Sequence, residues 1–217
     1  MPATAPISAA PSSPFAAPLA AGFADPVHDA QRAFAAVMRA MAEPGLAVPL
    51  ASDLDPPAPL SREAAAVALA LLDYETPVFL DGALAAAPAV AAFLRFHTGA
   101  PVVTDPAAAR FVLAADGAAM PDLAALAQGE PDYPDRSATL IVQLAELGEG
   151  ARVIEGPGIR GRRGFAAAPL PADFSARLAA NRAAFPLGVD LILTAPGADG
   201  AGSVMGLPRT VKPVMED

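Results

Sequence analysis

The stretch Phe185-Pro186-Leu187-Gly188-Val189-Asp190-Leu191-Ile192-Leu193-Thr194 decides the fold of this chain. Its first two residues end a helical pattern, and residues 187–194 form an apolar run that is too short for a helix and rich in strand-forming residues. We therefore predict a buried central strand. Asp190 is the one charge in the run, so its carboxylate either reaches a rim that water or a partner contacts, or is paired inside the protein.

Composition limits the classes of function that the chain can serve. Its 217 residues are the size of one domain, and its net charge of -9 argues against nucleic acid or an anionic membrane surface as the main partner. It contains no cysteine, which excludes disulfides, a thiolate nucleophile and iron–sulfur clusters, and its two histidines belong to no metal-binding motif. We expect a cytoplasmic protein without a bound metal.

The N-terminal residues 1–22 differ in composition from the rest of the chain. They are rich in alanine, proline and serine, contain no basic residue and are interrupted by Pro6, Pro11, Pro14 and Pro18. This pattern does not fit a secretory signal and indicates a disordered tail. Residues 23–217 are then expected to form a single α/β domain. Its longest uninterrupted apolar run covers only residues 64–72, which is too short to span a bilayer.

Caps and apolar periodicity predict helices and strands that alternate along the chain. Helices are predicted over residues 26–42, 62–74, 88–96, 122–128 and 171–182, and strands over residues 46–50, 76–80, 100–104, 110–115, 187–194 and 204–208. The apolar stripe of the first helix consists of Val27, Ala30, Phe34, Val37, Met38 and Met41. Residues 129–136 are predicted to be a polar loop, and residues 138–147 and 151–155 a hairpin around Gly148-Glu149-Gly150. The fold class is therefore α/β, with a mixed β-sheet flanked by helices.

The two histidines and the arginines near them are candidate binding residues. Arg95 and His97 lie where a predicted helix ends, so they either stabilise its terminal carbonyl groups or bind a phosphate, a phosphonate or a partner carboxylate. His28 lies with Arg32 and Arg39 on the polar side of the first helix, which is either a solvated face or an anion patch.

Two further features argue against familiar phosphate and cofactor chemistry. Gly156-Pro157-Gly158 precedes Arg160, Arg162 and Arg163, but this segment lacks the glycine spacing of a phosphate-binding loop and fits a tight turn with a solvated basic loop. The sequence also has no GxSxG nucleophile elbow. Lys212 is the single lysine and follows the last predicted strand, so pyridoxal-type chemistry through a Schiff base is not expected, and we predict no cofactor.

Six segments of the chain, taken in order, resemble one protein family. They are residues 34–45 (FAAVMRAMAEPG), 72–78 (LDYETPV), 95–101 (RFHTGAP), 156–159 (GPGI), the opening stretch 185–194, and 207–210 (LPRT). Together they closely resemble PhnH, the H subunit of the bacterial carbon–phosphorus lyase machinery. The resemblance extends from about residue 23 to residue 210, which leaves out little more than the N-terminal tail.

The resemblance implies a fold similar to that of the pyridoxal-phosphate-dependent transferases, but without the cofactor. It also implies a homodimer that joins the G, I and J subunits in a core complex for phosphonate use. That machinery joins an alkylphosphonate to the ribose C1 of ATP with loss of adenine, and so forms alpha-D-ribose 1-methylphosphonate 5-triphosphate when the substrate is methylphosphonate. The family supplies no catalytic residue to transfer to this sequence.

The resemblance predicts an accessory subunit of that core complex, with no independent active site. A stand-alone phosphonate- or nucleotide-binding protein or enzyme is the alternative, and Arg95, His97 and Arg209 are its candidate ligand-binding residues. A homodimer that only docks its partners is a third. In each case we expect Asp190 to make a structural or interfacial hydrogen bond, with Arg209 as a candidate partner.

Overall fold

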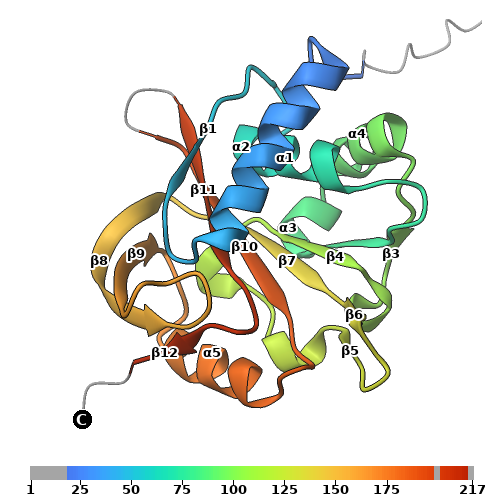
Figure 1. Ribbon diagram of the computed structural model, residues 1–217. Coiled ribbons are helices and arrows are strands. Elements are labelled where there is room, and N and C mark those ends of the chain that lie inside the picture. The colour runs from blue at the N-terminus through green and yellow to red at the C-terminus, as the bar shows by residue number, and fades with distance from the viewer. Residues whose placement is uncertain (1–18, 198–200, 215–217) are drawn as a thin grey trace, which may run out of the picture.

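A seven-stranded mixed sheet lies at the centre of the computed structural model, which describes residues 19–197 and 201–214 (Figure 1). Most of the predicted N-terminal tail, residues 1–18, is outside the described residues. The strands follow the order β1-β11-β10-β7-β4-β2-β3. Their bounds are β1 (Val48–Leu50), β2 (Val78–Leu80), β3 (Val102–Val103), β4 (Phe111–Ala114), β7 (Thr139–Gln143), β10 (Asp190–Ala195) and β11 (Gly202–Leu207). The strands from β10 to β3 are parallel, and β11 runs antiparallel to both of its neighbours.

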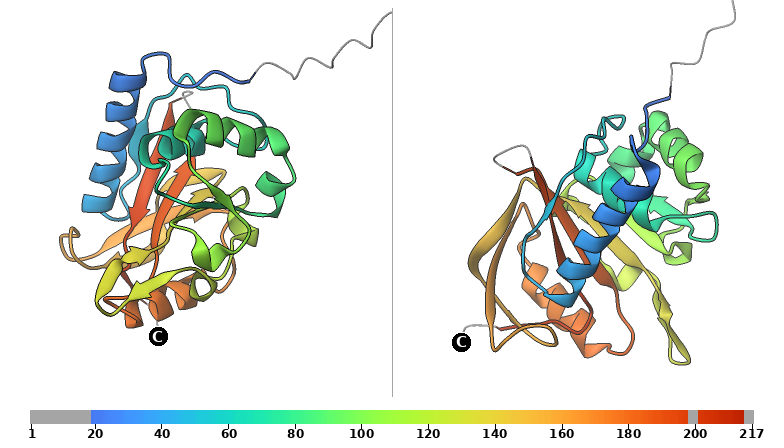
Figure 2. Two further views of the ribbon diagram at one scale, coloured as in Figure 1. Left: turned by 90° about the vertical axis from the view of Figure 1, so that its right-hand side faces the viewer. Right: turned by 45° about the horizontal axis from the view of Figure 1, so that its top comes forward.

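Different layers cover the two faces of this sheet (Figure 2). One face carries α1 (Pro26–Ala42), α2 (Arg62–Leu71), α3 (Gly82–Ala85) and α4 (Pro88–Thr98). The other carries α5 (Phe174–Ala183) and a small antiparallel sheet of β8 (Glu146–Glu155), β9 (Arg163–Ala168) and β12 (Lys212–Pro213). Single 3-10 turns are η1 (Pro106–Ala108), η2 (Gly117–Ala119) and η3 (Leu123–Ala125), and β5 (Gln128–Glu130) and β6 (Tyr133–Ser137) form a hairpin. The predicted α/β class with a mixed sheet and flanking helices is confirmed.

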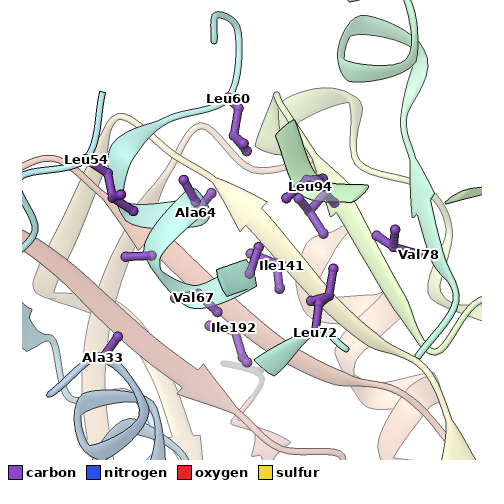
Figure 3. Close-up of a cluster of buried hydrophobic side chains, with 14 of the residues drawn as sticks. Ala33, Leu54, Leu60, Ala64, Val67, Leu72, Val78, Leu94, Ile141 and Ile192 are labelled. Atoms are coloured by element: carbon purple, nitrogen blue, oxygen red, sulfur yellow. The ribbon is translucent and has the colours of Figure 1, made fainter. Parts of the chain in front are cut away.

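The segment 185–194 contains the buried strand that its composition predicts, and this strand is β10. Successive side chains of β10 point to opposite faces of the sheet, so Leu191 and Leu193 enter the core under α5 while Ile192 enters the core under α2. Figure 3 shows Ile192 near Ile141 of β7 and Val67 of α2 in this second core. Because both faces are covered, the strand is a continuous apolar run instead of an alternating one.

Several predicted helix boundaries depend on single residues that set the local backbone. The Asp25 carboxylate accepts from the N–H groups of Val27 and His28 and begins α1, and the Ser61 hydroxyl accepts from Ala64 N at 3.1 Å and begins α2. Gly99, at φ +75°, ends α4 in the left-handed conformation that glycine tolerates best. Among the described residues, no helix combines the length and the apolar character that a membrane span requires.

The predicted hairpin around Gly148-Glu149-Gly150 is wrong. These residues lie inside the continuous strand β8, which pairs with β9 across an irregularity between Gly148 and Arg152. A Cβ on Gly150 would lie 2.6 Å from the Cβ of Ala166, so this glycine permits close strand approach at a bulge and does not mark a turn. The predicted loop over residues 129–136 is instead mostly the β5–β6 hairpin, and the predicted helix over residues 122–128 shortens to η3.

The apolar stripe predicted for α1 is largely wrong, because Val37 is the one residue of its six that is buried. The residues that α1 buries against the sheet and α2 are Ala33, Val37 and Ala40. A Cβ on Gly206 of β11 would be 2.7 Å from the Ala40 carbonyl oxygen, so the helix lies too close to the sheet for large side chains to fit between them. Val27, Phe34 and Met38 therefore face solvent, with 61%, 47% and 53% of their surfaces exposed. We call these three residues the outer stripe.

Candidate functional site

Asp190 and Arg209 form a closely bonded pair at the start of β10, which we call the Asp190–Arg209 joint. Arg209 Nη2 lies 2.5 Å from Asp190 Oδ2, Arg209 Nε donates to Oδ1 at 3.2 Å, and the backbone N–H of Arg209 donates to Oδ1 at 2.8 Å. The arginine and aspartate side chains are only 14% and 20% exposed. Asp190, the one charge in segment 185–194, is therefore paired inside the protein.

The rest of the Arg209 guanidinium is also engaged. Nη1 donates to the carbonyl oxygens of Pro134 at 2.8 Å and Pro186 at 3.4 Å, and Nη2 also donates to the hydroxyl of Ser137. The side chain thus ties β6 to the turn that precedes β10. A small anion could reach this guanidinium only by replacing contacts that hold the fold together.

Asn181 of α5 holds the same turn from the other side. Its buried amide donates to Val189 O and accepts from Val189 N, both at 2.8 Å, as a neighbouring strand would do. Gly188 passes directly over this amide at φ +117°, a conformation that favours glycine. The segment Leu187-Gly188-Val189 is therefore shaped by contacts on two sides.

His97 and Arg95 lie at the end of α4, away from the joint. His97 Nε2 is 3.0 Å from Ala20 O, and its ring makes edge contacts with Phe93 and Phe96 at centroid distances of 4.7 and 5.0 Å. Arg95 is exposed, and its guanidinium has no hydrogen bond or ion pair with any residue in the described part of the chain. Figures 1 and 2 show α4 and the β5–β6 hairpin at opposite ends of the molecule, so Arg209 does not join these two residues in one site.

Two exposed aromatic side chains flank the end of α4. Tyr74 and Phe96 expose 73% and 72% of their surfaces. The Cβ of Tyr74 is 3.4 Å from the position that a Cβ on Gly99 would take, and Phe96 lies one helical turn before that glycine. We call Tyr74 and Phe96 the aromatic pair. Exposed aromatic residues beside an arginine such as Arg95 have the composition of a protein–protein contact.

The charged side chains of α1 and of its two caps form ion pairs with one another along the helix. His28 pairs with Asp25 at 2.7 Å, Arg32 with Asp29, and Arg39 with Glu43 at 3.3 Å. The backbone N–H of His28, followed by its side chain, donates to Asp25 and lowers the pKa of this carboxyl below its usual value. These pairs fit the solvated helix face among the two alternatives for His28.

The basic segment after Gly156 closes the end of α1. Arg163 Nη1 donates to the carbonyl oxygens of Glu43 at 2.9 Å and Pro44 at 2.8 Å, groups that have no partner within the helix. Arg162 and Lys212 both approach Glu155, at 3.8 and 3.2 Å. The arginines of this segment thus serve largely as a cap and as surface ion pairs, as expected for a turn with a solvated basic loop.

A cleft that the sequence did not reveal lies beside the Asp190–Arg209 joint. Its volume is about 500 Å³, and it is lined by residues 107–110, residues 127–130 and Arg136. We call it the arginine cleft, after Arg110 and Arg136. These residues are far apart in the sequence and belong to no motif. The one signal in the sequence was that Arg110 is the single charge at the start of the strand predicted over residues 110–115, directly after the alanines 107–109.

The described residues contain no group of three or more histidine, aspartate or glutamate side chains that could hold a metal ion. The single lysine, Lys212, is 64% exposed on β12 and pairs with Glu155. These are the surroundings of a surface lysine.

The segments that carry the family resemblance meet one another in space. Gly158 packs against Ala42 and Pro44, which joins segment 156–159 to segment 34–45. Val78 N donates to Pro101 O at 2.9 Å, which joins segment 72–78 to segment 95–101. The Asp190–Arg209 joint connects the remaining two. The six matched segments thus contact one another in pairs within the fold. Some of them also carry exposed side chains, such as Phe34 and Phe96.

The fold and these contacts define an α/β protein with a mixed sheet, one antiparallel strand near its edge and apolar groups left exposed on two helices. Residues 21–213 match the family model described as "Bacterial phosphonate metabolism protein (PhnH)". The chain belongs to the PhnH family. It is also 44% identical, over 88% of its own length and 92% of the relative's, to the "Alpha-D-ribose 1-methylphosphonate 5-triphosphate synthase subunit PhnH" of Rhizobium meliloti (strain 1021).

Proposed function

We propose that the protein is an accessory subunit of the assembly that forms alpha-D-ribose 1-methylphosphonate 5-triphosphate during phosphonate breakdown. The observation that carries this proposal is the 44% identity, over nearly the full length of both chains, to a synthase subunit of that name. The proposed partners are a second copy of the chain and the G, I and J subunits, and the proposed location is the cytoplasm.

Two exposed surfaces support a role in assembly. The outer stripe places a phenylalanine, a methionine and a valine on one side of α1, and methionine adapts readily to a partner surface. The charges of α1 already pair within the helix, so the stripe can be buried without leaving them unpaired. The aromatic pair offers a second anchor beside Arg95, whose guanidinium has no partner among residues 19–197 and 201–214.

The proposal includes a relation to the pyridoxal-phosphate-dependent transferase fold without its cofactor. The mixed seven-stranded sheet covered on both faces supports this relation, as does the exposed position of the only lysine. Superposition of the strand order and strand directions on a transferase of that class tests it. A different order in the central parallel strands would contradict it.

Reconstitution with the G, I and J subunits tests the function. Adenine release from ATP and methylphosphonate is measured with the complete set and with this protein left out, and complex formation is followed by size-exclusion chromatography with light scattering. We expect omission to abolish or strongly reduce adenine release. Unchanged release, together with no complex, would refute the accessory role.

Surface variants identify the docking face in the same system. Phe34→Ser with Met38→Ser changes the outer stripe, and Tyr74→Ser with Phe96→Ser changes the aromatic pair. Because these side chains are about half exposed or more, each double variant should fold like the parent protein while at least one loses partner binding by about tenfold or more. Ala179→Ser, an exposed change on α5 on the other face of the sheet, is the matched control.

A further inference from the structure

We infer that the arginine cleft binds a phosphoryl or phosphonate group, with Arg110 and Arg136 as its cationic ligands. The inference depends on the proposed function only for which molecule carries that group. The charges and contacts of the cleft carry the rest.

Arg110 is held by its backbone while its charge is left free. Its N–H donates to Pro77 O at 2.8 Å and its carbonyl accepts from Thr139 N at 2.9 Å, which fixes the residue between β2 and β7. The residue is half-buried, and its guanidinium has no hydrogen bond or ion pair with any residue among 19–197 and 201–214. A guanidinium offers five donors in a planar fork that matches the oxygens of a phosphoryl group. Arg110 lines a cleft with room for a group larger than orthophosphate.

Arg136 supplies the second charge and is only weakly engaged. It lies 3.5 Å from Glu130, and the two side chains are 47% and 61% exposed, so this ion pair is weak and open to exchange. Its guanidinium also lies over the ring of Tyr133, 4.1 Å from the centroid, which keeps it at the mouth of the cleft. A bound anion can replace the Glu130 contact without unfolding any element.

The Asp190–Arg209 joint fixes the cleft wall that carries Arg136. Arg209 bonds Pro134 O and the Ser137 hydroxyl on the two sides of Arg136, and Gly188 N donates to Gln128 O at 3.0 Å on β5. The hairpin is thereby tied to the sheet at both strands. The backbone at Arg136 is thereby fixed relative to the sheet that holds Arg110 before any ligand binds, which lowers the entropy cost of binding.

Isothermal titration calorimetry on the full chain tests the inference, with inorganic triphosphate, ATP and methylphosphonate as probes. We expect saturable binding of at least one probe, weakened about tenfold or more by Arg110→Ala and weakened less by Arg110→Lys, which keeps the charge but loses the fork. Glu130→Gln should tighten binding several-fold, because it releases Arg136 and removes a negative charge near the anion. The preferred probe distinguishes a phosphonate from a nucleotide triphosphate group.

Arg160→Ala is the matched control, because Arg160 is an exposed arginine that forms no ion pair in the described part of the chain. It should leave the affinity unchanged. Absence of saturable binding for every probe would overturn the inference, as would equal losses from Arg110→Ala and Arg160→Ala. Neither result bears on adenine release by the reconstituted complex, so failure of this inference and failure of the accessory role can be told apart.

Discussion

Arg209 and Arg110 lie at the same end of the central strands, but the guanidinium of Arg209 is fully bonded within the fold and that of Arg110 is not. Asp190, the partner of Arg209, pairs in register with Thr139, and Thr139 pairs with Phe111, the residue after Arg110. The strands that begin at Asp190 and Phe111 are therefore separated only by β7 in the sheet. Arg209 makes side-chain contacts with three residues besides its carboxylate partner, whereas the Arg110 guanidinium contacts no described polar group. A charge neutralised within the fold supports structure, and a charge left free on a fixed backbone is available for a ligand.

Removing the two side chains in turn is the most severe test of this contrast. Arg209→Ala should lower the free energy of unfolding by about 3 kcal/mol, because it leaves the largely buried Asp190 carboxylate without its partner. Arg110→Ala should change it by less than about 0.5 kcal/mol. Urea titration followed by circular dichroism measures both values. Similar losses in the two variants would show that Arg110 also supports the fold.

Asn181 tests whether the joint depends on its second anchor. Asn181→Ala leaves the buried N–H and C=O groups of Val189 without partners and should cost about 2 kcal/mol in the same titration. Ser175→Ala, on the same helix, is the control. Since Asn181 and Arg209 hold one turn from two sides, the loss in the double variant should differ from the sum of the single losses. A strictly additive result would mean that the two contacts act independently.

The sequence predicted best where one residue sets the local backbone. Asp25 and Ser61 begin the helices predicted from residues 26 and 62, and Gly99 ends the helix predicted from residue 88. It failed where the outcome depended on a distant partner. Gly150 reads as a turn residue until Ala166 is known to lie beside it, and the helical spacing of α1 gives a period without saying which side the sheet takes.

The candidate site shows the same limit. The apolar run around Asp190 required that the charge be paired or reach a rim, and Arg209 was one possible partner. No local pattern distinguishes Arg209, whose donors are occupied, from Arg110, whose guanidinium donates to no residue in the described part of the chain. Arg110 and Arg136 come together only in the folded chain, because segment 107–110 and the β5–β6 hairpin both line the arginine cleft.

The smallest effect concerns an exposed charge that caps a helix. The hydrogen bonds from His28 lower the pKa of Asp25 in the folded protein, so its ionised form stabilises α1. That contribution is present above the pKa of the unfolded chain and is lost as the pH falls through the lower folded pKa. NMR titration of the Asp25 carboxyl carbon should therefore give a midpoint below the usual range for aspartate. Asp25→Asn should keep the cap and remove this pH dependence, and a midpoint at the usual value would contradict the assigned hydrogen bonds.

The position of β11 also has a consequence for the order in which the protein is made. β1 is synthesised early, yet among the described strands it pairs with β11 alone, which comes near the end of the chain. The N-terminal part of the chain leaves the ribosome first. β1 and the buried side of α1 therefore have no β11 to pack against until most of the chain has been synthesised. A nascent chain that stops before Gly202 would leave the edge of β10 open to pairing with another polypeptide.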